Sequence, residues 1–211
     1  MTDLYVLGIA HPAWIIRGQF SHEPAQIEFL RRAKSIADGE EPKWTNENVG
    51  EPAPGYWGCA PDEFHSALVR QYFDATQAEG YAVDIEAAGP HITFIGFCSL
   101  ETEQGLGVRF RGAEGVQVWS AGELETVLEL VYDVLASPEV PLWFHNGVNY
   151  DVWPQLEGNG FVINGFAGDT MLLATATYSE MPRGLEFLST LWCGIPMWKY
   201  LVDEKDMGET K

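Results

Sequence analysis

Two acids of this sequence are spaced so that they could hold a metal ion together. Asp84 and Glu86 alternate with apolar residues in YAVDIEAAG, residues 81–89, which predicts a β-strand. Residues i and i+2 of a strand point to the same face, so both carboxylates would project side by side. Hard divalent cations prefer such oxygen ligands. Solvated acids at a strand edge would give the same pattern, as is expected for the second D-x-E, at Asp38 and Glu40 in a polar segment.

A third acid stands in WFHNGVNYDVWPQL, residues 143–156, where an apolar strand runs into a polar turn and Asp151 opens a helix. An acid in the first helical turn is favoured by the helix dipole, so Asp151 could be a helix-start acid and no more. Alternatively, it joins Asp84 and Glu86 at one site. The second interpretation predicts that the three carboxylates converge in the fold.

The composition limits the classes of protein to consider. The chain has 211 residues with 46% hydrophobic residues, enough for one domain with a packed core and an appendage. No window approaches 18 apolar residues and no secretory signal is apparent, so we expect no membrane span. Three cysteines without metal-site spacing indicate reduced thiols and a cytoplasmic location. The net charge of −19 repels nucleic acid unless cations or a basic partner intervene, although it could equally reflect solubility.

Hydrophobic periodicity predicts the elements that would position these acids. Strands are expected over residues 4–10, 81–86, 92–98, 106–110, 116–119, 141–145 and 161–165. Helices are expected over 23–37, from Asp62 to Gly80, over 121–136, from near Asn149, and over 169–177 and 184–191. Three strands of antiparallel appearance, followed by alternating helices and strands, predict an α/β fold with a mixed sheet.

Together these segments resemble the DEDD-type 3′–5′ exonucleases. AVDIEAAGPHITFIGFCSLE resembles their first motif, and HNGVNYD matches the second, N-x-x-x-[FY]-D, at Asn146, Tyr150 and Asp151. GDTMLLATATYSEMPRGLEFLSTLWCGIP is similar to the segment that follows in the proofreading domains of family A DNA polymerases, with phage-type polymerases as the natural setting. The resemblance covers residues 80–200. It implies an RNase H-like mixed five-stranded sheet flanked by helices, with an N-terminal appendage, and cleavage of DNA from the 3′ end.

The resemblance also implies the roles of the residues. Asp84, Glu86 and Asp151 would hold two Mg²⁺ or Mn²⁺ ions, with Asp84 bridging them, for two-metal hydrolysis of a phosphodiester bond. Asn146 and Tyr150 would contact the substrate, a single-stranded DNA 3′ end. Packing in the core is the alternative for Tyr150, and equally for Trp153 and Trp192, other aromatic residues that could stack on a terminal base.

The sequence departs from the family in its third motif, which should supply a fourth carboxylate. No Y-x-x-x-D occurs, and none of the five histidines lies late enough for H-x-x-x-x-D. The nearest substitute is YLVDE, with Tyr200 and Glu204, while Asp203 and Asp206 are expected to belong to a solvated tail. Ala87 stands where relatives often carry threonine. We therefore expect the isolated chain to be weakly active or inactive.

The N-terminal segment HPAWIIRGQF, residues 11–20, resembles the late motif of the family 4 uracil-DNA glycosylases, in which the histidine, here His11, approaches the damaged nucleotide. The earlier parts of that fold are absent. This predicts a glycosylase-like remnant over 1–38, a linker or arm over 39–61 and an exonuclease-like domain over 62–211. Such a chain resembles the middle of a longer replication polypeptide, with a DNA polymerase domain or chain downstream as its partner.

Three functions remain open from the sequence. The first is a metal-dependent proofreading exonuclease module, working in the cytoplasm, or in the host cytoplasm if a phage encodes it. The second is a catalytically inactive module that binds DNA ends or docks a polymerase, which the missing acid favours. The third is a glycosylase remnant with repair activity.

Overall fold

The computed structural model describes residues 31, 34–40, 57–58 (backbone only), 65–76, 80–111 and 115–195. The chain divides into two compact units, Pro52–Leu172 and the combination of Met1–Glu51 with Leu173–Lys211. The sheet and both acidic segments belong to the first unit. The predicted strand 4–10 lies outside the described residues, and of the predicted helix 23–37 only Arg31 and 34–37 are described, all helical. The domain limits expected at residues 38 and 61 stay predictions.

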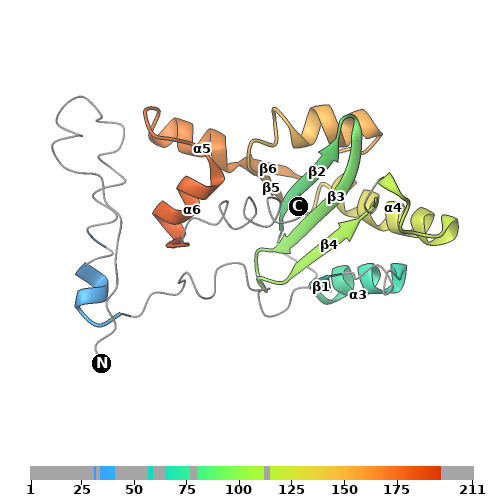
Figure 1. The fold of residues 1–211 in the computed structure, drawn as a ribbon, viewed down its shortest axis with the longest axis horizontal. Coiled ribbons are helices and arrows are strands. Elements are labelled where there is room, and N and C mark those ends of the chain that lie inside the picture. The colour runs from blue at the N-terminus through green and yellow to red at the C-terminus, as the bar shows by residue number, and fades with distance from the viewer. Residues whose placement is uncertain are drawn as a thin grey trace, which may run out of the picture. The chain divides into compact units, whose positions relative to one another are not determined.

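One mixed sheet organises the unit Pro52–Leu172 (Figure 1). Its strands are β1 (Trp57–Gly58), β2 (Tyr81–Ala88), β3 (His91–Ser99), β4 (Gly105–Arg109), β5 (Leu142–Phe144) and β6 (Phe166–Asp169). The order across the sheet is β1-β4-β3-β2-β5-β6. The pairs β2–β3 and β3–β4 are antiparallel, and the pairs β2–β5 and β5–β6 are parallel. The mixed five-stranded α/β sheet of the RNase H-like prediction is therefore confirmed, with the two-residue β1 added at its edge.

The central strand β2 separates a buried face from a polar one. Tyr81, Val83 and Ile85 are at most 4% exposed, whereas Asp84 and Glu86, which alternate with them, are exposed. This is the alternation expected of a strand with one face on the core. The sequence pattern of β2 therefore decides which face of the sheet carries the acids.

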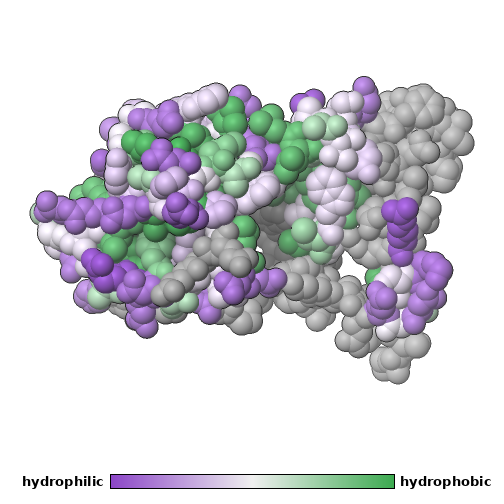
Figure 2. Space-filling model, turned by 180° about the vertical axis from the view of Figure 1, so that it is seen from behind, coloured by the Kyte–Doolittle hydropathy of each residue, from purple (hydrophilic) through white to green (hydrophobic). Residues whose placement is uncertain are grey.

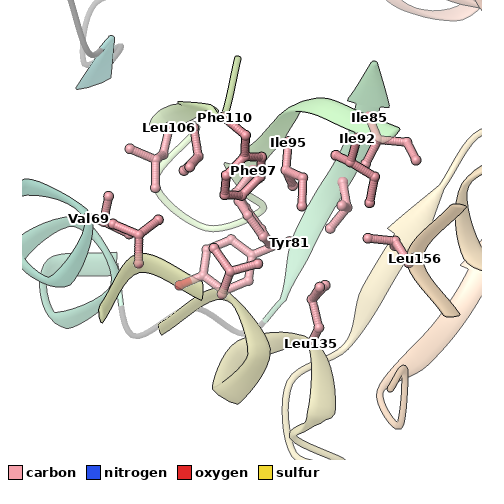
Figure 3. Close-up of a cluster of buried hydrophobic side chains, with 14 of the residues drawn as sticks. Val69, Tyr81, Ile85, Ile92, Ile95, Phe97, Leu106, Phe110, Leu135 and Leu156 are labelled. Atoms are coloured by element: carbon pink, nitrogen blue, oxygen red, sulfur yellow. The ribbon is translucent and has the colours of Figure 1, made fainter. Parts of the chain in front are cut away.

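Two helices, α3 (Ser66–Thr76) and α4 (Ala121–Ala136), supply apolar side chains to the core on the other face. Val69 and Tyr72 of α3 and the stripe Val127, Val131 and Leu135 of α4 are fully buried. Figure 3 shows this cluster, in which Tyr81 of the sheet lies between Val69 of α3 and Leu135 of α4. Burial of this apolar surface is the main stabilising term of the unit.

Polar contacts fix the two helices to each other. Ser120 caps α4 by accepting a hydrogen bond from the Glu123 amide. The carboxylate of Glu123 then accepts one from the Ser66 amide at the start of α3, at 2.5 Å. Hydrogen bonding with the Ser66 side chain, and then with the Ser66 amide, lowers the pKa of Glu123. The helix predicted over 121–136 has those same bounds, and the one predicted from Asp62 begins at Ser66 within the described residues.

Two predicted strands are wrong. Residues 116–119 form only an isolated bridge, between Arg111 and Gln117, because Trp119 turns into the core and donates to the Arg109 carbonyl. Residues 161–165 are irregular, since the Asn164 amide donates to the carbonyl of Leu135 at the end of α4. A Cβ at Gly165 would lie 1.9 Å from the Val140 carbonyl oxygen, so the chain passes too close there for another residue. The strand begins one residue later, at Phe166.

The remaining helices follow the polar turn and β6. They are η3 (Asp151–Leu156), η4 (Glu157–Asn159), α5 (Thr170–Thr177) and α6 (Leu185–Cys193). A second, smaller apolar cluster joins α5 to α6 through Ala174, Met181, Leu188 and Leu191.

The surface mixes polar and apolar residues. Hydrophilic (purple) and hydrophobic (green) residues are interspersed on the face shown in Figure 2. Within the part of the chain that the structure describes, no helix combines the length and apolar character needed to cross a bilayer.

Candidate active site

The polar face of β2 presents the first two acids as the sequence predicts. Asp84 and Glu86 share this face, and the chain register shifts directly after Glu86, between Glu86 and Ala87. Opposite Asp84 on β3 stands Gly96, which has no side chain of its own to place beside that carboxylate. A Cβ at Gly96 would lie 3.3 Å from the ring of Phe94.

A tight turn after β5 leads to the third acid. Asn146 has a positive φ of 63°, a conformation that asparagine tolerates better than most residues. Its carbonyl accepts hydrogen bonds from the amides of Asn149 and Tyr150, and its side chain accepts one from the Asn149 side chain at 3.2 Å. A Cβ at Gly147 would lie 2.3 Å from the Cβ of Phe144, so this turn folds tightly onto β5. Asn146 thus has a structural role in the turn, and its predicted contact with substrate stays a prediction.

Asp151 opens a short π-helix rather than an α-helix. The Val152 amide donates to the Gly147 carbonyl at 2.7 Å, five residues back. Pro154 inside η3 has no amide proton and therefore cannot make the α-helical bond to Tyr150. Single π-helical turns of this kind are frequent at functional sites. The Asp151 residue itself is only 2% exposed.

Neighbouring acids act electrostatically on Asp151. The pKa of the Asp151 carboxyl is raised to about 7. Burial is the largest cause, followed by the negative charges of Asp84 and Asp169, and Glu86 contributes in the same direction. Asp84 and Glu86 of β2 therefore act on the charge of Asp151 at the start of η3, while the prediction that the three acids form one site stays a prediction. A solvated helix-start acid would be neither buried nor coupled in this way.

The pKa of Asp84 is also raised, mainly because nearby protein atoms desolvate its carboxyl group in part, although the residue as a whole is exposed. His145, at the end of β5, acts in the opposite direction through its charge. The ring Nδ1 of His145 lies 2.8 Å from the Thr170 hydroxyl, which also donates to the Phe144 carbonyl. The loop after β5 and the start of α5 are thereby joined beside Asp84.

Asp169 is a buried acid of this region that the sequence reasoning did not single out. It ends β6, is 3% exposed and accepts hydrogen bonds from four backbone amides. The sequence does carry one signal for Asp169. It is an acid that follows an apolar segment and directly precedes a helix, in FAGDTMLL. This signal identifies a helix cap, but not the contacts that the cap makes elsewhere.

Carboxylate donors of this kind suit a hard divalent cation, because ionisation of the buried Asp151 is unfavourable without a counter-ion. Among the described residues, however, no three acids, histidines or cysteines lie close enough to hold one ion. The prediction that the three carboxylates lie within one coordination shell is therefore not met by these residues alone.

Several predicted residues cannot be placed. Glu204, its neighbours Asp203 and Asp206, and the glycosylase-like His11 lie outside the described residues. Tyr150, Trp153 and Trp192 are 41%, 60% and 49% exposed, so the packing alternative for these aromatic side chains is wrong.

Comparison with known proteins gives similarities of structure only. No family model matches the sequence, and no curated protein is significantly similar to it. Several solved structures align with the chain at low identity. The POL domain of Pol1 from M. smegmatis, in complex with DNA primer-template and dNTP, aligns with 62% of this chain at 14% identity and a TM-score of 0.49.

Two further structures are a ribonuclease and an exonuclease domain. RNase D of Trypanosoma brucei in complex with RNA U12 aligns with 71% of this chain at 14% identity and a TM-score of 0.48. The EXD2 exonuclease domain soaked in Mg and dGMP aligns with 69% at 16% identity and a TM-score of 0.40. The chain spans 22% of the Pol1 chain, 50% of the RNase D chain and 73% of the EXD2 domain. At this level of similarity, the function has to be argued from the residues of the chain itself.

Proposed function

We propose that this chain is the metal-dependent 3′–5′ exonuclease module of a DNA polymerase, of the proofreading type, and that a further acid must complete its site. The observation that carries the proposal is the burial of Asp151 beside Asp84 and Glu86. An acid whose pKa is raised by burial, and further by other acids, is unfavourable in its ionised form and therefore points to a functional site. Binding of divalent cations is such a function, because the cations neutralise the acids that destabilise one another.

Asp84, Glu86 and Asp151 would hold the ions. A pair of bound Mg²⁺ or Mn²⁺ ions would activate a water molecule and stabilise the leaving 3′ oxygen. The chain itself contributes the position of the acids: β2 fixes Asp84 and Glu86 on one face, and the turn after β5 fixes Asp151. Glu204 remains the candidate fourth ligand within this sequence. A Y-x-x-x-D segment of a downstream polymerase domain or chain is the other source.

The proposed substrate is the 3′ end of single-stranded DNA. With a net charge of −19 the chain would repel a phosphate backbone, so bound cations are needed for attraction as well as for hydrolysis. Tyr150 is half-exposed and directly precedes Asp151, so it could stack on the terminal base. We place the module in the cytoplasm, or in that of the host if a phage encodes it.

Metal binding and digestion of a 3′-labelled oligonucleotide test the proposal together. The chain would be titrated with Mn²⁺ and followed by electron paramagnetic resonance. It would then be incubated with DNA in Mg²⁺ or Mn²⁺, alone and with a polymerase segment that carries Y-x-x-x-D. Asp84→Ala should abolish Mn²⁺ binding and release of mononucleotides. Asp38→Ala should leave both unchanged, since Asp38 belongs to the other D-x-E of the chain and is exposed.

The inactive alternative predicts a different pattern. A module that only binds DNA ends or docks a polymerase would retain the oligonucleotide or the polymerase segment, yet release no nucleotide under any of these conditions. Equal Mn²⁺ binding by the wild type and Asp84→Ala would also count against the exonuclease. A glycosylase would release uracil from DNA and lose this activity in His11→Ala.

A further inference from the structure

We propose that Asp169 is a positioning residue of the site: its carboxylate holds the turn 146–148 against the start of α5 and thereby directs Asp151 towards Asp84. The catalytic meaning of this role rests on the function proposed above. The hydrogen bonds of Asp169 are independent of that function.

The carboxylate of Asp169 joins two segments of the chain. One oxygen, Oδ1, accepts hydrogen bonds from the Asn146 amide at 3.0 Å, the Met171 amide at 2.8 Å and the Leu172 amide at 3.3 Å. The other, Oδ2, accepts one from the Val148 amide at 3.3 Å. Two donors thus belong to the turn after β5, and two belong to the first turn of α5. Capping of α5 would need only the second pair.

These contacts distinguish Asp169 from the metal ligands. Four backbone donors already occupy its two oxygens, and the residue is 3% exposed. A cation bound there would have to compete with these four amide protons for the same two oxygens. Asp169 is therefore not the missing fourth ligand, although it is an acid close to Asp151.

The turn 146–148 connects Asp169 to η3, which begins with Asp151. Asn146 and Val148, which donate to Asp169, flank Gly147, whose carbonyl accepts the Val152 amide of η3 at 2.7 Å. Gly147 cannot shift towards β5, because Phe144 already fills the space where a Cβ would lie. Asp169 holds the turn on one side and Phe144 blocks it on the other. Asp151, the first residue of η3, therefore has little room to move. Loss of the Asp169 contacts should let η3 move and separate Asp151 from Asp84.

Two substitutions separate the turn from the helix cap. In Asp169→Asn an oxygen can stay at the Oδ1 position, so an NH₂ group would face the Val148 amide and lose that bond. In Asp169→Ser the shorter hydroxyl can still cap α5, as serine commonly does, but reaches the turn less well. Val127→Ala is the matched control, because it should lower stability by leaving a cavity at a fully buried position of α4 that is not part of the site.

The first readout is amide hydrogen exchange, measured by NMR where all variants are folded. In Asp169→Ser, the amides of Asn146 and Val148 should exchange at least about tenfold faster than in Val127→Ala, while those of Met171 and Leu172 stay comparatively protected. In Asp169→Asn, Val148 should be affected most. Exchange of Asn146 and Val148 within twofold of the control in both variants would overturn the role of Asp169 in the turn.

The second readout is the affinity for Mn²⁺, measured on the chain without DNA. Both Asp169 variants should bind Mn²⁺ at least about tenfold more weakly than the wild type, as expected for loss of a residue that orients a metal ligand. Val127→Ala should bind it like the wild type. Unchanged affinity in a variant with an opened turn would overturn the positioning role. If the wild type binds no Mn²⁺, the proposed function fails, and the exchange data alone decide whether Asp169 fixes the turn.

Discussion

Asp84 raises the pKa of Asp151, although the two acids come from different elements, β2 and the start of η3. Asp151 is buried, and water therefore screens the repulsion between them poorly. Without a cation, protonation of Asp151 is the way to relieve this repulsion. With a cation, both acids can ionise. The pair thus couples the stability of the fold to pH and, under the proposed function, to divalent metal.

We predict that Asp151→Asn stabilises the metal-free chain at pH 8. A carboxyl whose pKa is raised in the folded state favours folding below its unfolded pKa, and this contribution is lost as the pH rises through the folded value, about 7. The shift corresponds to a destabilisation on the order of 4 kcal/mol at pH 8, which asparagine would remove. The difference in unfolding free energy between the two proteins should therefore grow from pH 4 to pH 8 in urea titrations with EDTA.

Asp133→Asn is the control for this prediction, because Asp133 is an exposed acid on α4. It should show no comparable change with pH. Addition of Mn²⁺ at pH 8 should stabilise the wild type more than Asp151→Asn. A stability difference that stays constant from pH 4 to pH 8 would contradict the burial and coupling of Asp151.

Substitutions of Asn146 separate its structural role from a contact with substrate. The positive φ of 63° costs about 1–2 kcal/mol for a residue with an ordinary Cβ, so Asn146→Ala should destabilise the chain by about 1 kcal/mol. Asn146→Gly should fold normally, because glycine adopts this conformation freely. If Asn146 contacts DNA, Asn146→Gly should still lose affinity for a 3′ end in fluorescence anisotropy. Full affinity in this variant would limit Asn146 to the turn.

Two glycines should respond in opposite directions to alanine. Gly147→Ala places a methyl group 2.3 Å from the Phe144 Cβ, so we expect a loss of about 1–3 kcal/mol and a displaced turn. Gly122 lies in the first turn of α4, where an added methyl group would meet no atom within 4 Å, and Gly122→Ala should stabilise by about 0.5–1 kcal/mol. Thermal unfolding of both variants checks the pair. Equal changes in stability for Gly147→Ala and Gly122→Ala would contradict the close contact between Gly147 and Phe144.

Much of the fold could be predicted from periodicity. The alternation in β2 indicated which face carries Asp84 and Glu86, and the apolar stripe of α4 gave the bounds of that helix. These signals are local, because burial of one face imposes a period of two on a strand and 3.6 on a helix. The relation of Asp151 to Asp84 and Glu86 joins distant parts of the chain. The prediction that they share a site came from the family resemblance, and not from the local hydrophobic pattern.

The parts that could not be predicted depend on contacts between distant segments. Residues 161–165 have a strand-like composition, but Asn164 bonds to the end of α4 instead of to β5. Asp169 looks like an ordinary helix cap until the turn 146–148 is seen to donate to it. The π-helical start of η3 likewise follows from the closure of the Val152 amide on Gly147. None of these pairings has a local sequence signal.

The exposure of Tyr150 predicts a role in binding single-stranded DNA. Tyr150→Ala should weaken binding of an oligonucleotide 3′ end by about 1–3 kcal/mol, the range for loss of one stacked base. Tyr132→Ala is a control of the same chemistry, since Tyr132 is 40% exposed on α4, which is not part of the proposed site. Anisotropy titrations in Ca²⁺ would measure binding with little hydrolysis. Equal losses in both variants, or none in Tyr150→Ala, would remove Tyr150 from the substrate site.

The last prediction concerns the missing acid. The chain alone should digest a 3′-labelled single strand weakly or not at all, because three carboxylates hold a second cation poorly and two-metal hydrolysis needs both ions. The sequence also lacks the tyrosine of the third motif, and a misplaced nucleophile costs about 100-fold in rate. A Y-x-x-x-D segment, fused or supplied in trans, should therefore raise the Mn²⁺-dependent rate at least about 100-fold. The same segment with its aspartate changed to alanine should give no increase. Full-rate digestion by residues 1–211 alone, lost in Glu204→Gln, would show instead that this chain supplies its own fourth ligand.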